Sequence, residues 1–204
     1  MKKLLLSLSI GSALTLTACG EDTSLASVEQ EYAEATVVSS TRVAFDPSNG
    51  VLSVPNDLLF SDTTDGTLNP PVADPDDTSD PFVAVSTVDG WSTQQPFTVE
   101  FVLPAGVSAI DPTSIEQPGA VRLFEVVMGA SLTDPDCSSV TAGLACKLVG
   151  ELDYQTHFVT ARVANFPNKL AVVPTTPFKP GASYLVVLTN NLHDSLARPV
   201  EPSA

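Results

Sequence analysis

The chain has 204 residues and a formal net charge of −15, with 24 acidic residues against nine basic ones. A chain this acidic is repelled by nucleic acids and by anionic membrane surfaces, so we expect neither as a partner. Fifteen of the acids lie in residues 20–100, where Arg42 is the single base. The length suffices for one globular domain and a short additional segment.

The first 19 residues have the pattern of an export signal. Lys2 and Lys3 precede an apolar stretch, residues 4–16, which is too short to span a bilayer as a permanent helix. Ala18 and Cys19 follow, and this arrangement resembles the processing site of bacterial lipoproteins. The resemblance implies cleavage between Ala18 and Cys19 and lipid attachment at the Cys19 thiol, which would hold the chain on a membrane. An ordinary secretory signal with an incidental cysteine is the alternative.

Four segments are expected along the chain. They are a lipoprotein signal peptide at 1–18, a lipid-anchored acidic and flexible tether at 19–36, an extended segment with a Pro/Asp-rich loop at 37–95, and a β-sandwich at 96–204. In lipoproteins of Gram-negative bacteria an aspartate after the lipidated cysteine favours the inner membrane, and Gly20 stands there instead. We therefore expect an outer-membrane lipoprotein displayed at the cell surface.

Short β-rich runs separated by turn residues dominate the second half of the chain. The alternation of side chains predicts strands, and no helical period longer than two turns occurs. The predicted strands are 37–45, 98–103, 121–128, 147–152, 157–164, 170–173, 183–190 and a last one from residue 200. This pattern predicts an all-β fold, an immunoglobulin-like or fibronectin-like β-sandwich.

One detail supports that fold class. Phe178 lies six positions before Tyr184, with Pro180 and Gly181 between them. Immunoglobulin-like and fibronectin-like domains build a tyrosine corner in a similar way, so Tyr184 is predicted to be a structural corner residue whose hydroxyl bonds to the upstream backbone.

The cysteines agree with an exported protein. Cys137 and Cys146 remain once Cys19 carries lipid, and in an oxidising compartment this pair is expected to form a local disulfide. A zinc site would need nearby histidines, and His157 and His193 are distant in sequence.

No catalytic set is visible in the sequence. The runs that begin Gly129-Ala130-Ser131 and Gly181-Ala182-Ser183 do not close as Gly-x-Ser-x-Gly nucleophile elbows. The tripeptide 193–195 (HDS) contains the residue types of a triad, but adjacent side chains diverge in a turn and cannot form the relay. His157 is interpreted as a structural histidine in a strand. We therefore assign no catalytic residue.

Two other features have simple structural interpretations. The aspartates of segment 74–80 lack the central glycine and distal glutamate of a calcium loop, so a solvated acidic segment is the main hypothesis and a weakly bound ion the alternative. Trp91 is expected to cover the base of the sandwich rather than mark a ligand face. We expect no metal and no cofactor.

Several segments together resemble a known family. They are 45–50 (FDPSNG), 55–60 (PNDLLF), 65–69 (DGTLN), 89–93 (DGWST), 118–124 (PGAVRLF) and 179–189. In this order they are similar to the N-terminal domain of the bacterial virulence-factor lipases, the VolA-type surface lipoprotein phospholipases and related extracellular lipases. One departure is local: Ser195, Leu196 and Ala197 stand where a final hairpin turn would usually have a glycine.

The resemblance implies an accessory role for this chain. In that family an α/β-hydrolase domain with the serine nucleophile follows the N-terminal part, and the parent activity is cleavage of fatty acyl esters. The first hypothesis is therefore a lipid-anchored, non-catalytic module whose partners are the membrane and a downstream hydrolase domain. The alternative is a free-standing outer-membrane lipoprotein, a binding or adhesin-like β-sandwich.

Overall fold

The computed structural model describes residues 40–63 and 65–202. Every described residue belongs to one compact unit, Val38–Ala204. The predicted signal peptide, the Ala18–Cys19 processing site and the tether at 19–36 lie outside the described residues. No helix in the described part of the chain combines the length and the apolar character needed to cross a membrane.

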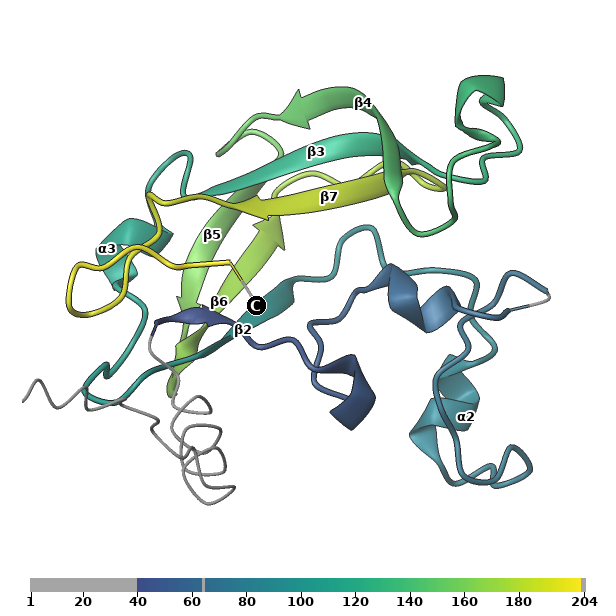
Figure 1. The fold of residues 1–204 in the computed structure, drawn as a ribbon, viewed down its shortest axis with the longest axis horizontal. Coiled ribbons are helices and arrows are strands. Elements are labelled where there is room, and N and C mark those ends of the chain that lie inside the picture. The colour runs from purple at the N-terminus through teal and green to yellow at the C-terminus, as the bar shows by residue number, and fades with distance from the viewer. Residues whose placement is uncertain (1–39, 64, 203–204) are drawn as a thin grey trace, which may run out of the picture. The chain divides into compact units, whose positions relative to one another are not determined.

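Seven strands account for most of the regular structure (Figure 1). The strands are β1 (Arg42–Val43), β2 (Phe97–Val102), β3 (Val121–Met128), β4 (Ala145–Leu152), β5 (Phe158–Val163), β6 (Phe166–Pro174) and β7 (Ser183–Leu188). They form a four-stranded sheet in the order β1-β2-β6-β5 and a three-stranded sheet in the order β4-β3-β7. All neighbouring strands are antiparallel. Two antiparallel sheets with few helices agree with the all-β prediction.

One hydrophobic core joins the two sheets. Phe101 and Leu170 reach it from the four-stranded sheet, and Val121 and Leu123 reach it from the three-stranded sheet; each is at most 2% exposed. Burial of such side chains stabilises a fold by about 25 cal/mol per Å² of apolar surface removed from water. The outer face of β7 is more open, since Leu185 remains 42% exposed.

Aspartate–proline pairs begin most of the short helices. These helices are η1 (Pro47–Asn49), η2 (Asp57–Phe60), α2 (Pro81–Val85), α3 (Pro112–Ile115) and η3 (Pro135–Cys137). At α2, α3 and η3 the preceding aspartate accepts a hydrogen bond from a first-turn N–H, and proline occupies a position that needs no donor. These caps are local, so they follow directly from the sequence.

The predicted first and last strands differ from the observed ones. Of the described residues in the predicted strand 37–45, Arg42–Val43 form β1, and residues 37–39 lie outside the described part. The described chain after residue 200 makes one isolated bridge rather than a strand. This bridge is parallel and joins Arg42 to Glu201, with the Glu201 N–H donating to the Thr41 carbonyl at 2.9 Å. Thr41 is only 1% exposed. Its hydroxyl donates to a buried carboxylate, described below.

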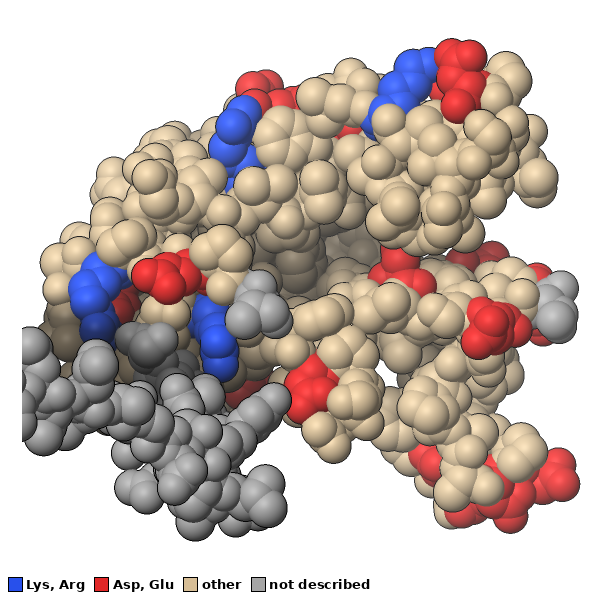
Figure 2. Space-filling view, in the orientation of Figure 1, with Lys and Arg blue, Asp and Glu red and all other residues tan. Residues whose placement is uncertain are grey.

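Figure 2 shows that acidic side chains gather around the segment that contains α2, whereas the two sheets carry few charges on this face. This distribution agrees with the unequal placement of acids in the sequence.

Candidate functional site

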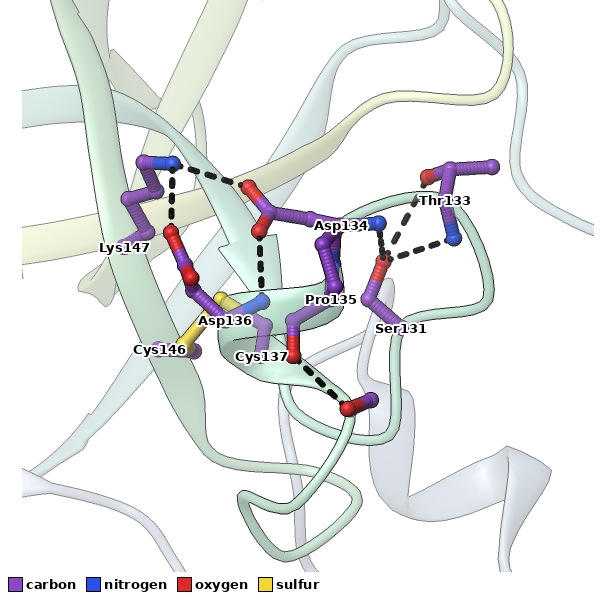
Figure 3. The surroundings of a disulfide bond; sticks show 9 residues. Ser131, Thr133, Asp134, Pro135, Asp136, Cys137, Cys146 and Lys147 are labelled. Carbon is purple, nitrogen blue, oxygen red and sulfur yellow. Dashed lines mark hydrogen bonds and ion pairs between the residues drawn. A yellow bond between two sulfur atoms is a disulfide. The ribbon is translucent and has the colours of Figure 1, made fainter.

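A disulfide closes the connection between β3 and β4 (Figure 3). It joins Cys137 to Cys146, with Cα atoms 5.8 Å apart. The helix η3 places Cys137, which is fully buried, and β4 places Cys146. The disulfide predicted from the sequence is therefore present. It fixes a loop whose residue Leu132 is fully exposed.

The β3 end of this loop depends on a glycine. A Cβ atom added to Gly129 would lie 2.1 Å from the Thr141 carbonyl oxygen, closer than any real contact. The next residue, Ala130, has a φ of 56° and donates its N–H to the Val140 carbonyl at 2.8 Å. Close backbone packing therefore holds the loop in addition to the covalent link.

Charges also stabilise the disulfide loop. The Lys147 ammonium lies 2.9 Å from the Asp134 carboxylate and 3.8 Å from that of Asp136 (Figure 3). The hydrogen bond from Lys147 lowers the pKa of Asp134, and the same interaction raises the pKa of Lys147. Both groups are thus ionised at neutral pH, and neither changes its protonation state in that range.

A second cluster surrounds a buried carboxylate near the end of the described chain. The Asp194 side chain is completely buried. One oxygen accepts from the Leu196 N–H at 2.9 Å and from the Arg198 N–H at 3.2 Å. The other accepts from Thr41 Oγ1 at 2.9 Å and from the Arg198 guanidinium at 2.9 and 3.1 Å. We call Thr41, Asp194, Leu196 and Arg198 the Asp194 cluster.

The Asp194 cluster keeps its carboxylate charged. Burial alone raises the pKa of Asp194, but hydrogen bonds from Arg198, from the Leu196 N–H and from Thr41 outweigh burial, so the net pKa lies below its usual value. The carboxylate accepts hydrogen bonds from five donors. The bond from Thr41 links two residues that are 153 positions apart in the sequence.

The neighbours of Asp194 are not arranged as a catalytic relay. In the described part of the chain the Asp194 carboxylate accepts from the Thr41 and Arg198 side chains. Ser195 Oγ accepts from the Ser108 N–H at 3.1 Å and from the Ser108 hydroxyl at 3.2 Å. Through its backbone, His193 accepts from the Asp111 N–H at 2.9 Å. These contacts anchor a turn.

The other histidine has a local role. His157 precedes β5 rather than lying in the strand as predicted, and its Nδ1 accepts the Asp153 N–H at 2.9 Å. This bond closes a turn between β4 and β5. It requires an unprotonated Nδ1, since a protonated nitrogen has no lone pair to accept with.

Tyr184 is the second residue of β7 and bonds to the chain upstream. Its hydroxyl accepts the Lys179 N–H at 2.9 Å, and its ring centroid lies 4.7 Å from that of Phe178. The Lys179 ammonium in turn lies 2.6 Å from the Glu125 carboxylate. These contacts fix the path of residues 178–184 into the three-stranded sheet.

The acidic segment uses its carboxylates locally. Asp74 accepts from the Asp76 N–H, Asp77 accepts from Ser79, and Asp80 caps α2. Among the described residues, no group of three or more histidines, cysteines and acids is placed to hold a metal ion. Trp91 is half-buried, and its Nε1 is buried without a hydrogen-bond partner among the described residues.

The comparison with family models identifies the chain. The model described as bacterial virulence factor lipase N-terminal matches residues 22–204. The chain belongs to this family. The match confirms the resemblance seen in the sequence and makes the chain a lipase N-terminal domain. Searches of curated proteins and of solved structures each found no match.

Sequence reasoning missed the Asp194 cluster of this lipase N-terminal domain. The sequence predicts a tight turn at 193–195, whereas His193 and Asp194 form isolated bridges and the turn follows at residues 195–197. The buried role of the Asp194 carboxylate is not part of that prediction. One signal was present: Arg198 lies four positions after Asp194, a spacing that allows an ion pair within a tight turn. Nothing in the sequence pointed to Thr41 as the third member.

Proposed function

We propose that this chain is a lipid-anchored, non-catalytic module of a surface lipase or lysophospholipase, with the α/β-hydrolase domain outside these 204 residues. The observation that carries the proposal is the family match over residues 22–204. A lipase N-terminal domain that carries a lipid would hold its hydrolase where ester substrates are available, at the outer surface of the cell.

The anchor is proposed from the pattern of the first 19 residues. A positive start, a short apolar stretch and Ala18 before Cys19 support lipidation of the Cys19 thiol. An acylated cysteine adds about 0.8 kcal/mol of membrane affinity for each buried methylene, so two or three acyl chains retain a protein on the membrane. Gly20 in place of an aspartate supports the outer membrane.

The non-catalytic role is supported by the side chains that could have formed a relay. Asp194 bonds Thr41 and Arg198, and Ser195 bonds Ser108, so none is free to activate a nucleophile. We expect the purified chain to release no fatty acid from lysophosphatidylcholine, whereas a longer product of the same locus with a Gly-x-Ser-x-Gly motif would release it. Turnover by the 204-residue chain would contradict the proposal.

The fold of the module is proposed to be an immunoglobulin-like sandwich. The strand orders β1-β2-β6-β5 and β4-β3-β7 support it, since they correspond to A-B-E-D and C′-C-F in that fold. The Tyr184 hydroxyl bond to Lys179 supports a tyrosine corner at the start of strand F. A solved structure in which the two sheets do not pack face to face would contradict this assignment.

Lipidation and location are tested together. Cells that express the chain are labelled with radioactive palmitate, and the membranes are fractionated. We expect label in the wild type, no label in Cys19→Ser, and the labelled band in the outer-membrane fraction, where external protease degrades it. Unlabelled wild type would overturn the anchor, and protease resistance in intact cells would place the module on the periplasmic leaflet instead.

A further inference from the structure

A cavity of about 470 Å³ lies between α3 and the hairpin that joins β5 to β6. Figure 1 shows α3 beside β5. The volume of the cavity falls in the range of about 300–1,000 Å³ that is usual for small-molecule sites. No member of the Asp194 cluster lines the cavity.

The floor of the cavity is apolar. Ile110 and Ile115 line it from one side and are themselves 2% and 1% exposed members of the hydrophobic core. Val163 and Phe166 line it from the hairpin side, where Phe166 is 52% exposed. Ile110 and Ile115 expose almost no surface, so an apolar chain laid there would contact Val163 and cover part of the Phe166 ring.

Hydrogen bonds hold the two walls in place. The Ile110 N–H donates to the Pro167 carbonyl at 2.9 Å, which joins the α3 side directly to the hairpin. Thr160 Oγ1 donates to the Ile115 carbonyl, and the Tyr154 hydroxyl donates to the Glu116 carbonyl at 3.1 Å. The cavity is therefore formed before any ligand arrives, which reduces the entropy lost on binding.

A cation without a carboxylate partner stands at the cavity. Five of the seven basic residues in the described part of the chain form ion pairs with acids, and the two that do not are Arg42 and Arg162. Arg162 is exposed on β5 and lines the cavity. Beside an apolar cavity, an arginine with no acidic partner among the described residues favours an anionic ligand locally, and this attraction opposes the net charge of −15.

The second basic residue at the cavity is neutralised already. Lys169 lies 2.9 Å from the Glu100 carboxylate and 5.3 Å from the centroid of the Phe166 ring. Asn168 also donates to Glu100, at 3.1 Å. The Glu100 charge is therefore engaged by two neighbours, and the Arg162 guanidinium is the group left to bind an anion.

We propose that this cavity binds a single-chain anionic amphiphile, with the hydrocarbon against Val163 and Phe166 and the anionic head at Arg162. A fatty acid supplies a carboxylate and a lysophospholipid supplies a phosphodiester, and both have the required chemistry. The inference concerns binding by this module itself, so it goes beyond anchoring and stands whether or not a hydrolase domain follows.

Binding is measured by isothermal titration calorimetry on the mature chain with Cys19→Ser, which removes acyl groups that would compete. The probes are decanoate, dodecanoate and lysophosphatidylglycerol, each below its critical micelle concentration, with dodecanol as the uncharged control. We expect one site, with affinity rising from decanoate to dodecanoate by up to about fourfold per methylene, the fold-change for one fully buried CH₂. Tighter binding of dodecanoate identifies a fatty acid as the ligand, and tighter binding of lysophosphatidylglycerol identifies a phospholipid.

Two arginine variants test the head-group contact. Arg162→Gln is expected to weaken binding of the anions by about tenfold, the usual effect of one charge-assisted hydrogen bond, and to leave dodecanol unchanged. Arg42→Gln is the matched control, since Arg42 also has no carboxylate partner among the described residues but does not line the cavity. Equal affinity for dodecanoate and dodecanol, equal loss in both variants, or no saturable binding would each overturn the proposal. Circular dichroism checks that both variants are folded.

Discussion

Replacement of Asp194 by alanine should destabilise the folded chain more than any other exchange of a carboxylate in it. The side chain is completely buried and accepts hydrogen bonds from Thr41, Leu196 and Arg198. Alanine leaves the hydroxyl of Thr41, a residue that is 1% exposed, and two N–H groups without acceptors. Each of these donors that water does not reach lowers the free energy of unfolding by about 1–3 kcal/mol. The Arg198 side chain is 44% exposed and can turn to water. We expect a loss of about 3–5 kcal/mol in the free energy of unfolding.

The assay is urea denaturation of the purified chain at pH 7, followed by circular dichroism. The control is Asp153→Ala, which removes a carboxylate whose side chain is 79% exposed and should change stability by less than about 0.5 kcal/mol. A loss below about 1 kcal/mol for Asp194→Ala would refute the reasoning, because it would mean that water satisfies the orphaned donors.

The pH dependence tests the same site with the milder variant Asp194→Asn. The pKa of Asp194 is lowered in the folded state, so its charge stabilises the fold fully above the unfolded value of about 3.9 and loses this effect as pH falls through the folded-state pKa. The stability difference between wild type and Asp194→Asn should therefore be constant from about pH 5 to 8 and shrink below about pH 4. A stability difference that stays constant down to pH 3 would show that the cluster does not stabilise the fold through the charge of Asp194.

Three further exchanges have defined outcomes in the same urea assay. Replacing both Cys137 and Cys146 by serine should lower the free energy of unfolding by about 2–3 kcal/mol, since the closed loop is short, and reduction of the wild type should have the same effect. Ala197 has a φ of 58°, so Ala197→Gly should raise the urea midpoint by relieving up to about 1 kcal/mol of backbone strain, and a lower midpoint would contradict this. Tyr184→Phe removes the bond from the Lys179 N–H and should cost about 1 kcal/mol, and no change would mean that water replaces the hydroxyl.

The strands of the second half could be predicted because their signal is local. Val121 and Leu123 are buried and Arg122 between them is exposed, which is the alternation visible in the sequence. The observed β3, Val121–Met128, has the predicted bounds, and β2, β4, β5 and β7 differ by at most two residues at either end. Segment 44–96 has apolar residues in short clumps divided by turn residues, and it forms only short helices and irregular chain.

The departure at residues 195–197 was also visible in the sequence, but its consequence was not. Ala197 takes the positive φ that a glycine would accept without strain, so the turn keeps its shape with a less suitable residue. The Asp194 carboxylate bonds the N–H groups of Leu196 and Arg198 on both sides of Ala197 and holds the turn closed. A buried side chain therefore compensates for a local cost, and only the tertiary structure reveals such a compensation.

The Asp194 cluster and the cavity could not be predicted because each joins distant parts of the chain, and the structure also joins them to one another. The Ser195 N–H donates to the Ala109 carbonyl at 3.0 Å, and Ala109 lines the cavity next to Ile110. Ile110 in turn forms a bridge with Asp194. Loosening the cluster would thus disturb one wall of the cavity, so weaker binding by an Asp194 variant could not be assigned to the ligand contact. Arg162 lies on the other wall and is exposed, which is why its exchange separates recognition of the anion from stability of the fold.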